Sequence, residues 1–205
     1  MDHSAPTLPD TATISTYPLF QNLPLERIRV IQTLDQCQQI EAELKAAKIL
    51  GFDTESRPTF TKGEIQTGPH LIQLATETDA WLFQVSPEIL QFLQTILSSN
   101  TQLKTGFGLK NDAHLFRKKG IQLNHTVDLS RCFTQLGFKN PLGIKNAIAV
   151  LFQQNFPKRK SVSTSNWSRK NLSPQQIEYA AADAYAPVLI FKALQQQGLL
   201  PPDIS

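Results

Sequence analysis

The chain of 205 residues has little of what membrane-spanning and secreted proteins need. No run of apolar residues approaches the roughly 20 that a helix needs to cross a bilayer. The stretch Met1–Thr16 is rich in Ser, Thr, Pro and Ala and lacks the apolar core of a secretory signal. Two cysteines, Cys37 and Cys132, are too few for a disulfide framework and lack metal-ligand spacing. We therefore expect an intracellular protein, cytoplasmic or nucleoid-associated, with no membrane partner.

The overall composition is that of an ordinary globular protein. Hydrophobic residues make up 40% of the chain and charged residues 18%. The length suits one domain with a sizeable core, and the sequence contains no internal repeat. We expect a flexible N-terminal tail over residues 1–25 and a single folded domain over residues 26–205.

Acidic residues are scarce in one long segment. Between Lys104 and Lys170 there are thirteen Lys and Arg but only two acids, a balance of +11, whereas the rest of the chain has seven basic and fifteen acidic residues, a balance of −8. A segment this basic suggests a polyanionic partner. The alternative is an ordinary solvated surface, since Lys and Arg mostly lie outside anyway.

The hydrophobic pattern predicts strands with a hairpin first, then alternating strands and helices. This order is typical of an α/β domain with a mixed sheet. The expected strands are 49–55, 70–76, 81–85, 103–107 and 125–128, and the expected helices are 34–47, 86–97, 110–119, 129–136, 142–152 and 173–197. Ser86 followed by Pro87, and the capping box from Ser173 to Gln176, mark two helix starts.

The strand 49–55 ends in two carboxylates, Asp53 and Glu55. Side chains alternate along a strand, so these two point the same way. Like charges at the end of an apolar strand are costly unless a cation lies between them, and a hard divalent cation is the obvious candidate. Two other acid-x-acid pairs have simpler interpretations, because Glu41 lies on a solvated helix face and Glu77 in a hairpin turn.

The last expected helix carries a second pair, Tyr179 and Asp183. They are four residues apart and share a face, and the three alanines between them allow a neighbour to approach closely. The alternative is a Tyr with its hydroxyl bonded elsewhere and an Asp paired to a surface Lys. The alanines weaken that alternative.

Asp112 lies in the first turns of the helix 110–119. It follows a Gly-x-Gly turn that lacks the third glycine of a dinucleotide site and the Lys-Ser/Thr of a phosphate loop. A carboxylate at a helix N-terminus is also favoured by the helix dipole, so Asp112 alone points to no single function.

Taken together, these residues resemble the DEDDy family of 3′–5′ exonucleases, and in particular its ribonuclease D and Werner-syndrome exonuclease branch. The resemblance covers residues 32–194. The matching motifs are Gly51-Phe52-Asp53-Thr54-Glu55, the stretch 108–116, and a third stretch from Asn166-Trp167-Ser168 through Ser173-Pro174-Gln175-Gln176 to Tyr179-Ala180-Ala181-Ala182-Asp183. The third is the most specific, because a loop Trp, a helix cap and the Tyr/Asp pair coincide.

The resemblance implies a ribonuclease H-like fold, with a mixed five-stranded sheet flanked by helices, and a 3′–5′ exonuclease domain over residues 26–205. It also implies two divalent cations, Mg²⁺ or Mn²⁺, and release of nucleoside 5′-monophosphates from DNA or RNA. Asp53 would bridge both ions, Glu55 and Asp183 would complete the first, and Asp112 would reach the second.

Tyr179 is poorly suited to be a general base, since a free phenol has a pKa near ~10. We assign its hydroxyl to hydrogen-bonding and aiming the attacking water.

Six basic residues are candidates for binding the nucleic-acid backbone. Arg57 continues the parity of Asp53 and Glu55, although it could equally be a surface residue. The other five lie in the loop before the last helix and are Lys158, Arg159, Lys160, Arg169 and Lys170. A solvated loop is the simpler alternative.

Two other functions stay open: a non-catalytic adaptor on the same fold, and another two-metal enzyme such as an endonuclease or phosphatase. All four acids and the Tyr are present, which favours the exonuclease. No residue selects DNA over RNA. We expect the substrate to be a single-stranded or 3′-ended nucleic acid, with target choice supplied by a helicase or other protein partner.

Overall fold

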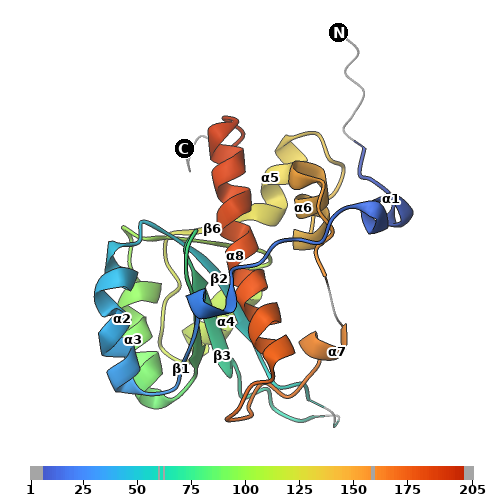
Figure 1. Ribbon diagram of the computed structural model, residues 1–205. Coiled ribbons are helices and arrows are strands. Elements are labelled where there is room, and N and C mark those ends of the chain that lie inside the picture. Colours follow the sequence, from blue (N-terminus) through green and yellow to red (C-terminus); the bar gives the residue numbers. More distant parts are fainter. Residues whose placement is uncertain (1–6, 60, 62, 158–159, 201–205) are drawn as a thin grey trace.

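The computed structural model describes residues 7–59, 61, 63–157 and 160–200, and a mixed sheet forms its centre (Figure 1). The six strands run in the order β1-β4-β3-β2-β5-β6. They are β1 (Ile28–Ile31), β2 (Ile49–Glu55), β3 (Leu71–Ala75), β4 (Ala80–Gln84), β5 (Leu103–Gly106) and β6 (Thr126–Asp128). Strand β3 is antiparallel to both of its neighbours, and the other pairs are parallel.

Helices cover both faces of the sheet (Figure 1). The α-helices are α1 (Thr11–Thr16), α2 (Leu34–Ala46), α3 (Pro87–Leu97), α4 (Lys110–Lys118), α5 (Leu129–Gln135), α6 (Ile144–Phe152), α7 (Lys160–Ser163) and α8 (Pro174–Gln196), and a 3₁₀ turn spans Leu25–Arg27. Helices α2, α3 and α4 pack on one face through an apolar core that includes Phe52, Leu74 and Phe116. Helix α8, with α5 and α6 beside it, covers the other face.

The expected α/β fold is confirmed, but the described residues contain one strand more than the five expected. The additional strand is β1, at the edge of the sheet, where Ile28 pairs with Ala80 of β4. It has only four residues, and its partner lies about fifty positions along the chain, so no local hairpin signal marks it.

The segment 7–25 is more ordered than the loose tail that we expect from its composition. Asp10 caps α1, and Leu19 forms an isolated parallel bridge with Asn155. Ile14, Phe20 and Leu23 are buried. This part of the expected tail therefore packs on the domain, whereas residues 1–6 lie outside the described residues, and the domain boundary itself stays a prediction.

Helix α8 lies very close to strand β2. A Cβ built on Gly51 would come within 1.8 Å of the Ala184 carbonyl oxygen, so only glycine fits there. Ala180, Ala181 and Ala184 are fully buried on the same side of the sheet. Small residues on both elements thus bring the face of α8 with Tyr179 and Asp183 down onto the end of β2.

Lys104 belongs to the basic segment in the sequence but is fully buried in β5. Its ammonium donates hydrogen bonds to the carbonyls of Ile96, Ser99 and Gln102, at and beyond the end of α3. Burial lowers the pKa of Lys104 to about 8, while these three acceptors favour the charged form. This cation supports the fold and is not available to a polyanion.

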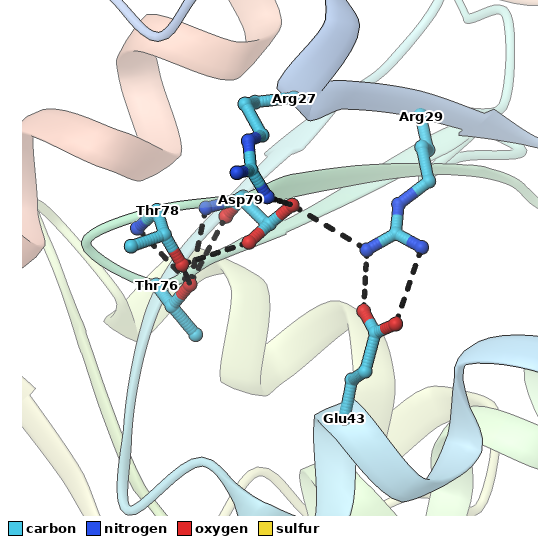
Figure 2. A network of polar contacts seen from close by, with 6 residues as sticks. All are labelled: Arg27, Arg29, Glu43, Thr76, Thr78 and Asp79. Carbon is cyan, nitrogen blue, oxygen red and sulfur yellow. Dashed lines mark hydrogen bonds and ion pairs between the residues drawn. The ribbon is translucent and has the colours of Figure 1, made fainter.

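A balanced cluster of charges ties the β3–β4 turn to β1 and α2 (Figure 2). Asp79 in the turn lies 3.5 Å from both Arg27 and Arg29, and Arg29 also pairs with Glu43 of α2. The Arg29 guanidinium lies 5.5 Å from the centre of the Trp81 ring. The turn expected between the two strands is confirmed, and its residue Asp79 is paired with the two nearby arginines.

Among the described helices, none combines the length and the apolar character that crossing a membrane requires.

Candidate active site

Three carboxylates converge where β2 meets α8. Asp53 and Glu55 project from the same side of β2, and Asp183 projects from α8 towards them. One oxygen from each of the three residues lies within 4.8 Å of the others. The close approach of α8 at Gly51 makes this possible. The structure therefore brings together three of the four acids that the sequence singles out.

The environment of Asp53 disfavours its charge. Burial, followed by the carboxylates of Asp183, Glu55 and Asp112, raises the pKa of Asp53 well above its usual value, and the backbone N–H of Thr54 opposes this. A bound cation would reverse the effect by stabilising the ionised form. The donors are all carboxylate oxygens, which suit hard cations such as Mg²⁺ and Mn²⁺. The residues present therefore fit the implied metal ions.

Asp112 lies beside this cluster without being one of its three members. It projects from the first turn of α4 and accepts a hydrogen bond from the Thr54 hydroxyl, which points away from Asp53 along β2. Burial raises the pKa of Asp112, and the bond from Thr54 opposes the rise. Its charge acts on Asp53, so the two carboxylates share one electrostatic site.

Tyr179 is buried next to the three carboxylates. Burial, the charges of Asp183 and Glu55, and a hydrogen bond to Asp183 raise the pKa of the Tyr179 hydroxyl far above its usual value. The phenol therefore stays protonated and acts as a hydrogen-bond donor. The Trp167 ring packs 6.1 Å from the Tyr179 ring, and its indole N–H donates to the Ser163 carbonyl. Trp167 thus packs against the Tyr179 ring and helps to fix its position.

A cavity of about 180 Å³ opens onto the cluster. Its walls are Asp53, Glu55, Phe107, Ile144, Tyr179 and Asp183. Phe107 and Ile144 come from the segment after β5 and from the start of α6, and periodicity alone marks them only as apolar residues. A second, mainly apolar cavity of about 370 Å³ shares the Tyr179 wall and includes Leu23 and Phe156.

The four basic candidates that the structure describes are not gathered in one place. Arg57 forms an ion pair with Glu64 at 2.6 Å. Lys158 and Arg159 lie outside the described residues, and Lys160 is exposed at the start of α7. Arg169 and Lys170 line a cavity of about 270 Å³.

His70 connects this basic cavity to the backbone at the end of β2. It lines the same cavity as Arg169 and Lys170, and its backbone N–H donates to the Glu55 carbonyl at 2.8 Å. Arg169 and Lys170 thus share a cavity with a residue that is hydrogen-bonded to the end of β2.

Sequence reasoning misses Gln73, a polar residue at the site. It lies in β3 directly opposite Asp53 and is fully buried. In the sequence it is one polar residue in the apolar strand Leu71–Ala75, and only the strand register reveals its neighbour.

Comparison with known proteins adds an independent identification. A family described as 3′-5′ exonuclease matches residues 28–198. A "3'-5' exonuclease" of Arabidopsis thaliana is 29% identical over 160 residues, covering 76% of this chain and 54% of that protein. The mouse "Bifunctional 3'-5' exonuclease/ATP-dependent helicase WRN" is 28% identical over 166 residues, covering 78% of this chain and 12% of that protein. The chain thus spans about half of the first relative and a small part of the second.

A solved structure supports the fold. Trypanosoma brucei RNase D in complex with RNA U12 has a TM-score of 0.71 at 20% identity, covering 89% of this chain and 64% of that one. At this identity the likeness shows the fold alone, which is that of the ribonuclease D branch suggested by the motifs. The family match extends from β1 to the end of α8 and includes every carboxylate of the site, and the chain therefore belongs to the 3′-5′ exonuclease family.

Proposed function

We propose that the protein hydrolyses the last phosphodiester bond at the 3′ end of a nucleic-acid strand and releases nucleoside 5′-monophosphates. The observation that carries this proposal is the convergence of Asp53, Glu55 and Asp183 oxygens within 4.8 Å, beside a protonated Tyr179. The family membership and the cavity over the cluster support it.

The carboxylates would hold two divalent cations, Mg²⁺ or Mn²⁺. Asp53, Glu55 and Asp183, whose oxygens lie within 4.8 Å of one another, would hold one ion. Asp112, which is hydrogen-bonded to Thr54 and acts on Asp53 through its charge, would contribute to holding the second. When bound, such ions activate the attacking water and neutralise charge on the leaving oxygen. Four carboxylates balance the charge of two dications, which agrees with the cost of ionising Asp53 without them.

The chain's own groups would orient the reactants. The Tyr179 hydroxyl, held by Asp183 and backed by Trp167, would donate a hydrogen bond that aims the water. The water oxygen would form a bond to phosphorus and give up a proton to the solvent, the bond from phosphorus to the 3′-oxygen of the preceding nucleotide would break, and that oxygen would take up a proton from the solvent. Tyr179 would keep its proton and act only as a donor, since even a free phenol has a pKa near ~10.

The surrounding surface suits an unpaired strand. Arg169 and Lys170 would contact phosphates close to the end of β2. The apolar cavity that shares Tyr179 has room for a base beside Leu23 and Phe156. The T. brucei RNase D structure contains RNA, which makes RNA one of the substrates to test.

Digestion of end-labelled strands tests the proposal. Matched single-stranded DNA and RNA, and recessed duplexes, are incubated with Mn²⁺, Mg²⁺ or EDTA at fixed salt. We expect stepwise loss from the 3′ end that EDTA abolishes, and the preferred sugar decides between DNA and RNA. Internal cuts or free phosphate would instead indicate another two-metal enzyme, and binding without cleavage would indicate an adaptor.

A further inference from the structure

The side-chain amide of Gln73 is buried. Its side chain is 0% exposed, and neither its Nε2 nor its Oε1 has a hydrogen-bond partner among the described residues. Its strand neighbours Leu71 and Ala75 pack under α8, and side-chain alternation places Gln73 on the same face. An apolar side chain would fill this position without leaving polar atoms unsatisfied.

The strand register sets Gln73 directly across from Asp53. The two residues are partners in the antiparallel pair of β2 and β3, so their side chains leave the sheet on the same face. The Cβ atoms of such partners lie roughly 4.5–5.5 Å apart, well within the reach of a Gln side chain. The side chain directly across from Gln73 on the facing strand is therefore the Asp53 carboxylate.

Asp53 needs hydrogen-bond donors once it is ionised. One of its oxygens lies within 4.8 Å of an oxygen of Asp183 and of one of Glu55, and carboxylates donate no hydrogen bonds when ionised. Carboxylates that hold metal ions are themselves held by hydrogen bonds from neighbouring groups. Gln73 is the unused donor on the neighbouring strand.

We propose that Gln73 is a positioning residue whose Nε2 donates a hydrogen bond to the Asp53 carboxylate when that carboxylate binds a cation. This inference rests on the proposed function, because it assigns Gln73 to the same metal site. It explains why a fully buried strand retains an amide: the group is unsatisfied in the metal-free protein and satisfied in the loaded one.

Thr105 provides a matched control on the other side of β2. It is 0% exposed, its hydroxyl also lacks a hydrogen-bond partner within the described part of the chain, and its partner across the strands is Gly51 instead of Asp53. Gln73→Met and Thr105→Val each remove one unsatisfied polar group at nearly constant shape. We expect both variants to melt at or above the wild-type temperature without metal, because neither loses a hydrogen bond.

The variants should differ in their response to cations. Melting temperature is measured against Mn²⁺ concentration for the full chain, which yields an apparent metal affinity without any substrate. We expect Gln73→Met to weaken that affinity about 10–100-fold and Thr105→Val to leave it unchanged. Gln73→Leu, a second apolar replacement, should behave as Gln73→Met does.

The same titration separates failure of the inference from failure of the proposed function. If wild type and Gln73→Met respond equally to Mn²⁺, the inference is overturned while the metal site stands. If Gln73→Met and Gln73→Leu both melt far below wild type without metal, the amide is already bonded in the folded protein and the inference is again overturned. If wild type itself does not respond to Mn²⁺ or Mg²⁺, the proposed metal site fails and the inference fails with it.

Discussion

Two charged clusters lie towards opposite ends of strand β3. One contains charges of both signs, and the other contains only acids. At the β3–β4 turn, Asp79 pairs with Arg27 and Arg29, and Arg29 also pairs with Glu43 (Figure 2). At the other end, Asp53, Glu55 and Asp183 gather within 4.8 Å of one another. The first cluster is neutralised by the fold, whereas the second accumulates charge of one sign.

The difference separates a structural cluster from a functional one. The ion pairs at the turn are partly exposed and join the 3₁₀ turn, β1, α2 and the β3–β4 turn. Such pairs lower the energy of the folded chain slightly. The carboxylates at the end of β2 raise that energy, because burial and mutual repulsion oppose the ionisation of Asp53. A fold retains such an arrangement when a ligand of opposite charge compensates for it, and this suggests a site for cations.

The largest expected effect comes from Asp53→Asn, which removes charge from the like-charged cluster. It should lower exonuclease turnover by more than about 100-fold, because a residue that binds the metal directly contributes more to activity than one that only hydrogen-bonds to a metal ligand. It should also abolish the rise in Tm on adding Mn²⁺, while the metal-free Tm stays level or rises as repulsion is relieved. Label-release assays and thermal melts measure both, and a variant that keeps its Mn²⁺ response would contradict the assignment.

Tyr179→Phe sharpens the comparison by leaving every carboxylate in place. We expect turnover to fall about 10- to 100-fold through loss of the hydrogen bond that aims the water. The Mn²⁺-induced shift in Tm should match that of wild type. Rapid-quench assays at saturating substrate measure the chemical step, and normal turnover would remove Tyr179 from the mechanism.

Replacing Arg169 and Lys170 together by Ala tests whether cations near the carboxylates serve the substrate. We expect weaker binding of single strands, and a plot of log affinity against log salt less steep by up to about 1.4, since each phosphate contact contributes about 0.7. Lys45→Ala in α2, with Lys48→Ala in the turn that follows it, removes equal charge as a control. Equal losses in the two double variants would indicate a general charge effect and no local groove.

The smallest effect is expected from Asp79→Asn, the same chemical change as Asp53→Asn made in the balanced cluster. The free energy of unfolding should fall by less than about 1 kcal/mol, and by less still at high salt. Exonuclease activity and the Mn²⁺ response should be unchanged. Urea denaturation at low and high salt measures the effect, and a loss of metal response here would undo the contrast between the two clusters.

Local signals predict much of the fold. Strand 49–55 and the start of α8 at its capping box are found where the sequence places them, because an apolar run and a Ser-Pro-x-Gln cap act within a few residues. The Asp53/Glu55 pair and the Tyr179/Asp183 pair also follow from local periodicity. Local periodicity does not predict that the two pairs lie close together in space. The family resemblance predicts it.

Features that depend on distant partners are absent from the sequence reasoning. The burial of Lys104 depends on carbonyls at the end of α3, and the hydrogen bond between Thr54 and Asp112 depends on how α4 follows β5. The position of Gln73 opposite Asp53 depends on the register of the two strands. A slip of one residue would move every side chain of the strand to the other face of the sheet.

Anomalous diffraction from crystals grown with Mn²⁺ tests the central claim most directly, because it locates the ions without substrate or turnover. We expect manganese bound by the carboxylates of Asp53, Glu55 and Asp183, with a second site reached by Asp112. Crystals with well-ordered side chains but no anomalous density at these carboxylates would contradict it.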